Sequence, residues 1–152
     1  MPTRAAHRTS GRRAMVEHMT TSTGEPPNDP VGKLGATSID CPDPAELADF
    51  YSALLGMRRL VESPDGNVIA ITDGAQTLAM MRVEDHVPPT WPGPPQRQQM
   101  HLDVSVTDLD EAVRRAVTLG ARVADHQAGP AMWRVLIDPA GHPFCLTTVG
   151  AG

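Results

Sequence analysis

The residues best suited to chemistry in this 152-residue chain are His101 and Cys145. His101 opens the alternating segment 101–106, which is typical of a strand, so Asp103 shares its face of that strand. An imidazole titrates near neutral pH and can act as an acid, a base or a metal ligand. Residues two apart on a strand are separated by about 6.5–7 Å, so we expect no direct hydrogen bond between His101 and Asp103. The alternative is that His101 and Asp103 are two polar residues on a solvated sheet face and have no chemical role.

Cys145 lies in a second predicted strand, on the opposite face from its neighbours Phe144 and Leu146. A reactive thiol requires a lowered pKa and a nearby positive charge. The sequence does not show that a positively charged residue lies near Cys145. The pattern therefore favours a small buried residue. With Cys41, the chain has two cysteines, which are too few for a disulfide framework and lack zinc-finger spacing.

The elements that must position these residues occur twice, because His101 follows Ala36 by 65 residues and Gly120 follows Gly56 by 64. Each copy begins with a short alternating strand. An amphipathic helix follows, and Asp43 or Asp108 stands at the position of its N-cap. Three short strands separated by turns complete each copy. The predicted strands after the helices lie near residues 57–62, 67–72 and 76–83 in the first copy and near 122–126, 132–137 and 143–149 in the second.

This repeat predicts an α+β fold of two βαβββ modules, in which two curved sheets surround a cleft and the helices cover the outer faces. Module one is expected at residues 33–86, a Pro-rich linker at 87–97 and module two at 98–150. Together they form one predicted domain, residues 33–150.

Residues 1–32 contain almost no periodic apolar positions, which predicts a disordered tail. No apolar run follows its arginines, so we expect no signal peptide; Met15 or Met19 is an alternative start to Met1. The net charge of −5 argues against a nucleic-acid partner. No segment approaches the roughly 18–20 apolar residues of a membrane span. A cytoplasmic protein with no membrane partner is expected.

Two segments resemble a known family: Asp43–Gly56, with its Phe-Tyr and Leu-Leu-Gly, and Ile137–Leu146, which reads Ile-Asp-Pro-Ala-Gly-His-Pro-Phe-Cys-Leu. The chain resembles the vicinal oxygen chelate superfamily of glyoxalase, bleomycin-resistance and extradiol dioxygenase proteins over about residues 33–149. It is most similar to actinobacterial-type glyoxalase-like domains. In metal-dependent members, a His or Gln from the first strand and a Glu from the last strand of each module hold a divalent ion.

The resemblance implies a degenerate metal site here. His101 matches a ligand position, whereas Ala36 and Cys145 stand where ligands are expected, and residues 76–82 contain no His, Asp or Glu. Three of the four positions therefore lack the usual residue, and we expect no metal or other cofactor. A divalent metal remains the alternative, although a His/Cys pair has fewer than the three or four protein ligands usual for Zn²⁺.

The favoured function is binding of a small, partly apolar molecule in the cleft between the modules. The alternative is an enzyme (a lyase, isomerase or dioxygenase) that depends on a metal or uses His101 as its catalytic acid or base. Exposed sheet edges also allow a homodimer. His142 is expected to make local hydrogen bonds, His86 to lie in a solvated loop, and Trp91 either to line the pocket or to seal the edge between modules. The predicted ligand-binding residues are Ala36, Met81, Trp91, His101, Asp103 and Cys145.

Overall fold

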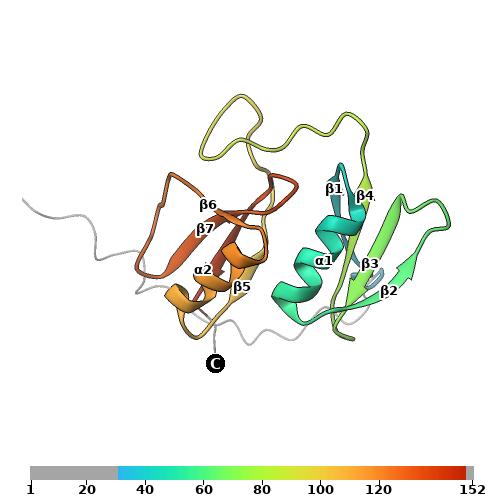
Figure 1. Cartoon of the computed structure of the whole chain (residues 1–152), viewed down its shortest axis with the longest axis horizontal. Helices are drawn as coiled ribbons and strands as arrows, with labels where there is room; N and C mark the ends of the chain where they lie inside the picture. The colour runs from blue at the N-terminus through green and yellow to red at the C-terminus, as the bar shows by residue number, and fades with distance from the viewer. Residues whose placement is uncertain (1–30, 150–152) are drawn as a thin grey trace, which may run out of the picture. The chain divides into compact units, whose positions relative to one another are not determined.

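The computed structural model describes residues 31–149, so almost all of the predicted tail and the alternative starts lie outside the described residues. The described residues from Leu34 onward form one compact unit, and all the elements discussed below belong to it (Figure 1).

The first module is a four-stranded sheet with one helix, and its strand order is β1-β4-β3-β2. The edge strand β1 runs parallel to β4, and the other neighbours are antiparallel. Its elements are β1 (Thr37–Cys41), α1 (Pro44–Leu55), β2 (Arg58–Glu62), β3 (Val68–Thr72) and β4 (Thr77–Arg82).

The second module repeats this topology with the order β5-β8-β7-β6. The prediction of two βαβββ modules is therefore confirmed. Some strands are shorter than expected: the predicted strand over 101–106 is reduced to three residues, and His101 precedes it. Its elements are β5 (Asp103–Ser105), α2 (Leu109–Thr118), β6 (Arg122–Val123), β7 (Trp133–Ile137) and β8 (Pro143–Thr147).

The helices begin at the predicted caps. The carboxylate of Asp43 accepts from the backbone N–H groups of Ala45 and Glu46 at 2.9 and 3.2 Å. The carboxylate of Asp108 accepts from Glu111 N–H at 3.0 Å. These bonds satisfy donors that the first turn of a helix leaves without a backbone partner.

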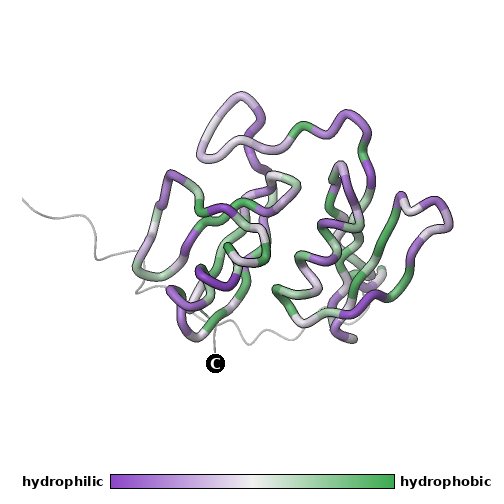
Figure 2. The backbone as a smooth tube through the Cα atoms, viewed as in Figure 1, coloured by the Kyte–Doolittle hydropathy of each residue, from purple (hydrophilic) through white to green (hydrophobic). Residues whose placement is uncertain are grey.

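One hydrophobic core joins the two modules through their helix-bearing faces. Phe144 of β8 lies 5.9 Å from Phe50 and 6.3 Å from Tyr51 of α1, measured between ring centroids, and both contacts are edge-to-face. The same cluster includes Ala116 of α2 and Ile71 of β3. Figure 2 shows the hydrophobic stretch along β3 and the mostly hydrophilic character of the connection between β4 and β5.

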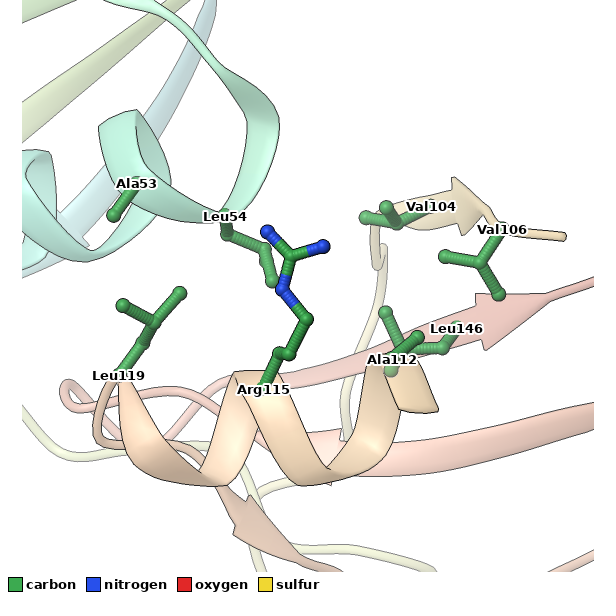
Figure 3. Close-up of a pocket in the computed structure, with 8 residues that line it drawn as sticks. All are labelled: Ala53, Leu54, Val104, Val106, Ala112, Arg115, Leu119 and Leu146. Atoms are coloured by element: carbon green, nitrogen blue, oxygen red, sulfur yellow. The ribbon is translucent and has the colours of Figure 1, made fainter. Parts of the chain in front are cut away.

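The two helices also line a small apolar gap of about 100 Å³, shown in Figure 3. Arg115 extends from α2 toward Leu54 of α1. The remaining walls come from both helices, from β8 and from β5 with the residue that follows it. The two modules therefore pack together on the side of the sheets that carries the helices. The opposite face of each sheet is not part of this contact. No helix within residues 31–149 is long and apolar enough to cross a membrane.

Candidate functional site

A pocket of about 400 Å³ lies between β1 of the first module and the segment that leads into β5 of the second. Its walls mix hydrophobic side chains with hydrogen-bonding groups of both charges, which is typical of sites for small molecules. The lining residues are Thr37, Ser38, Ile39, Asp40, Tyr51, Pro89, Gln96, Arg97, Gln99, Met100, His101, Leu102, His142 and Pro143.

Hydrogen bonds between the modules hold the walls of this junction pocket. The imidazole Nε2 of His142 lies 2.7 Å from the backbone oxygen of Asp40, and because a carbonyl only accepts, Nε2 is the donor. The hydroxyl of Tyr51 donates to Asp138 at 2.8 Å. The other carboxylate oxygen of Asp138 accepts the backbone N–H of His142 at 2.9 Å. A single turn, 138–142, thus binds both β1 and α1.

Burial dominates the electrostatics of this turn. Asp138 is 4% exposed, and burial raises the pKa of its carboxyl group, although the hydrogen bonds from His142 and Tyr51 partly offset this effect. Burial and the negative charge of Asp138 raise the pKa of Tyr51 well above its usual value. Tyr51 is therefore a neutral donor to Asp138 across the physiological range.

His86 contributes to the same region; it lies in a loop, as predicted, but it is not fully solvated there. Its side chain is half-buried, its Nε2 donates to the backbone oxygen of Ala140 at 2.8 Å, and its ring lies 5.2 Å from that of His142. The prediction of local hydrogen bonding for His142 is also too narrow, since its imidazole bonds to a residue of the other module.

The side chains of His101 and Asp103 approach each other more closely than the roughly 6.5–7 Å between same-face residues of one extended strand. The distance from His101 Nε2 to Asp103 Oδ1 is 3.4 Å. The expectation assumed that both residues belong to one extended strand, but β5 begins only at Asp103, which frees the His101 side chain to turn toward the carboxylate. The other ring nitrogen, Nδ1, lies 2.6 Å from the side-chain amide of Gln98.

Cys145 lies beside this pair, because β5 and β8 align Asp103 with Cys145 in the sheet register. Its side chain is buried, and burial, the charge of Asp103 and a hydrogen bond to that carboxylate raise the pKa of the thiol to about 11. At neutral pH the uncomplexed thiol is protonated and weakly nucleophilic. This supports the interpretation of Cys145 as a buried residue rather than a reactive thiol.

Trp91 packs on the same face of the second sheet. It joins Trp133 in a hydrophobic cluster that includes Ile137 and Cys145, and its indole N–H donates to the backbone oxygen of His126 at 3.0 Å. Trp91 therefore packs against the second module, and it is not one of the residues that line the junction pocket.

The structure brings His101, Asp103, Cys145 and Trp91 into one region but leaves two predicted ligand-binding residues elsewhere. Ala36 is exposed ahead of β1, and Met81 of β4 is 38% exposed. Of the six predicted residues, His101 is the one that lines the junction pocket.

No local pattern in the sequence predicted the hydrogen bond between Tyr51 and Asp138, because the two residues lie 87 positions apart. The one available signal was the proximity of Asp138 to His142 in a five-residue turn. Gln98 and Arg97 carried no signal, because they follow a Pro-rich segment without periodicity.

A family model described as a glyoxalase-like domain matches residues 36–147. The chain belongs to this glyoxalase-like domain family, and the resemblance to the vicinal oxygen chelate superfamily is confirmed. No curated protein sequence matches the chain at a significant level.

Solved structures share the fold at low sequence identity. A glyoxalase/bleomycin resistance protein/dioxygenase family enzyme from Burkholderia phytofirmans aligns with a TM-score of 0.59 and 17% identity over 76% of this chain and 97% of that one. A fosfomycin resistance protein variant from Listeria monocytogenes, complexed with Mn(II) and dihydroxypropylphosphonic acid, has a TM-score of 0.59 and 12% identity over 78% and 90%. Lactoylglutathione lyase from Agrobacterium tumefaciens has a TM-score of 0.50 and 18% identity over 81% and 95%. At these identities the alignments establish the fold alone. The chemistry of the site has to be argued from the residues of this chain.

Proposed function

We propose that this domain binds a small, partly apolar molecule in the junction pocket. The observation that carries the proposal is the pocket itself, since about 400 Å³ falls within the range of small-molecule sites and both modules contribute walls. The similar proteins include a fosfomycin resistance protein and a lactoylglutathione lyase, which by their names act on small molecules.

The lining indicates the chemistry of the ligand. Ile39, Met100 and Leu102 offer apolar contacts, while Arg97 offers a guanidinium that can pair with a carboxylate, a sulfonate or another anionic group. An apolar body with one anionic or hydrogen-bond-accepting group suits this combination. The apolar, anionic dye anilinonaphthalene sulfonate is therefore a suitable first probe.

Filling the pocket should abolish this binding. We expect Ser38→Trp to weaken dye binding at least tenfold, because Ser38 is an exposed strand residue that lines the pocket and an aromatic ring suits a strand. Fluorescence titration measures the affinity. A thermal-shift screen of neutral metabolites and antibiotics, run on the same two proteins, extends the test to other ligands.

Ser105→Trp is the matched control, because Ser105 is also exposed on the first strand of its module but does not line the pocket. This variant should bind the dye as the wild type does. Two results together would contradict the proposal. The wild type and Ser38→Trp would bind the dye with equal affinity, and no screened compound would stabilise one of the two proteins more than the other.

An enzymatic role is the second candidate, favoured by the 3.4 Å approach of His101 to Asp103 at the edge of the pocket. A carboxylate beside an imidazole can orient the ring for proton transfer to or from a bound molecule. If a substrate is found, His101→Gln should lower kcat by about 100-fold or more while KM changes little. Normal turnover by the variant, measured in steady-state kinetics, would exclude His101 as the catalytic acid or base.

Assembly and location remain predictions. Strand β2 is an edge strand with exposed Leu60 and Val61, and such an edge can pair with a second copy of the chain. Light scattering coupled to size-exclusion chromatography measures whether a homodimer forms. A cytoplasmic location is proposed on the sequence grounds given above.

A further inference from the structure

Arg115 lies on a face of α2 that is otherwise apolar. Ala112, Arg115 and Leu119 are spaced i, i+3 and i+7, which places them on one side of the helix and its C-cap. All three line the gap between the helices, and the Arg115 guanidinium extends toward Leu54 of α1 (Figure 3). A long cationic side chain usually lies on the solvated face of an amphipathic helix, so its position at an apolar gap calls for an explanation.

The walls of this gap are apolar apart from Arg115. Ala53 of α1 and Ala112 of α2 line it, and such small side chains leave space that the close packing of a protein interior would otherwise fill. The volume of the gap is about 100 Å³. Since a cavity of about 150 Å³ can hold benzene, the gap has room for a chain of about four or five carbon atoms. The other apolar walls are Leu54, Val104, Val106, Leu119 and Leu146.

A wider recess of about 370 Å³ adjoins the gap. Ala53, Arg115 and Leu119 line both spaces. The recess has in addition the exposed polar side chains of Glu111, Arg114 and Thr118. Arg115 therefore stands at the boundary between an apolar space and a polar one, and the two spaces together are called the interhelical groove.

The charge available at this boundary is positive. Arg114 donates to the carboxylate of Glu111, so these two charges neutralise each other. Arg115 forms no ion pair with any carboxylate of residues 31–149. A guanidinium can bind a carboxylate through two parallel hydrogen bonds. A molecule with an apolar chain and one carboxylate would therefore place the chain in the gap and the carboxylate on Arg115.

We propose that the interhelical groove binds a short-chain aliphatic carboxylate, with its chain in the apolar gap and its carboxylate paired with Arg115. This ligand matches both features of the groove, because an uncharged chain would leave Arg115 without a partner and a small anion would leave the gap unfilled. No described residue lines both the groove and the junction pocket. The proposal is therefore independent of ligand binding in the junction pocket.

The test is a titration of the full-length protein with hexanoate, followed by NMR of the backbone amides. We expect saturable shifts concentrated at Ala53, Ala112, Arg115 and Leu119, which line the gap. Hexylammonium has a chain of similar length with the opposite charge, and it should cause no saturable shifts at these residues. Acetate keeps the carboxylate without the chain, and its affinity should be at least tenfold lower than that of hexanoate.

Variants assign the two parts of the groove. Arg115→Gln should weaken hexanoate binding at least tenfold, because it removes the cation that pairs with the carboxylate. The matched control is Arg122→Gln, which removes an exposed arginine of β6 that lines neither space. Ala53→Phe should have a similar effect because its ring fills the groove, and its control is Ala45→Phe, at an exposed position near the start of α1.

Hexanoate binding that is weakened in Arg115→Gln and Ala53→Phe, and retained in both controls and in Ser38→Trp, supports the site. Absence of saturable binding in the wild type, equal affinity for hexylammonium, or unchanged affinity in Arg115→Gln would each overturn it. Binding that is lost only in Ser38→Trp would assign hexanoate to the junction pocket and would also overturn the groove site. Arg115 and Ala53 are exposed, so neither variant alters the core, and circular dichroism of each variant verifies the fold.

Discussion

Replacing Asp138 with alanine is expected to lower the free energy of unfolding by about 3 kcal/mol, because it leaves the buried hydroxyl of Tyr51 and the N–H of His142 without their acceptor. Each unsatisfied buried group costs about 1–3 kcal/mol, and removal of the carboxylate's own desolvation offsets part of the sum. Urea denaturation followed by circular dichroism measures the change.

Tyr51→Phe provides the second arm of a double-mutant cycle. This variant removes one donor to the Asp138 carboxylate, and we expect a loss of about 2 kcal/mol. The double variant should be less destabilised than the sum of the two single variants, because both remove the same hydrogen bond. Additive effects would show that Tyr51 and Asp138 contribute to stability independently.

The raised pKa of Asp138 also predicts how stability depends on pH. Because the folded protein binds this proton more tightly than the unfolded chain, the carboxyl group's contribution to stability is fully present below its unfolded pKa of 3.8 and is lost as pH rises through the folded pKa. From about pH 4 toward neutrality, the wild type should therefore lose stability relative to Asp138→Asn. Parallel stability curves for the two proteins would be inconsistent with a buried, titrating Asp138.

Replacing Phe144 with alanine should produce an effect of similar or greater size, a loss of about 3–5 kcal/mol. Phe144 is 1% exposed and contacts Phe50 and Tyr51 edge-to-face across the boundary between modules. Its removal leaves a cavity at the place where α1 meets β8. Thermal and urea unfolding measure the loss.

Phe144→Leu is the matched control, because it keeps an apolar side chain and most of the volume. We expect a loss of about 1.5 kcal/mol or less for this variant. If the modules unfold separately in Phe144→Ala, two transitions should replace one. A loss below 1 kcal/mol, with a single unchanged transition, would show that the aromatic contact is not required to join the modules.

Local patterns predicted most of the fold. Alternation with a period of two defines a strand, a 3.6-residue period defines a helix, and the caps at Asp43 and Asp108 depend on neighbours within three residues. These signals require no knowledge of distant contacts. They predicted the order of elements in both modules, and the shortened β5 was the main departure at the candidate site.

The candidate site was predicted less completely, because its contacts join distant residues. The sequence identified His101, Asp103 and Cys145 one by one, but the assumption of an extended strand separated His101 from Asp103. The direct contact arises because the chain becomes a strand only at Asp103. No local pattern marks Gln98 as the partner of His101.

The sequence by itself determined the two βαβββ modules and the residue types available for chemistry. Only the tertiary structure decided which of these residues meet: Tyr51 with Asp138, Asp40 with His142, and Asp103 with Cys145. Periodicity and capping are set by residues a few positions apart. Contacts between modules are set instead by how two apolar helix-bearing faces pack together, and that arrangement leaves no periodic signal in the sequence.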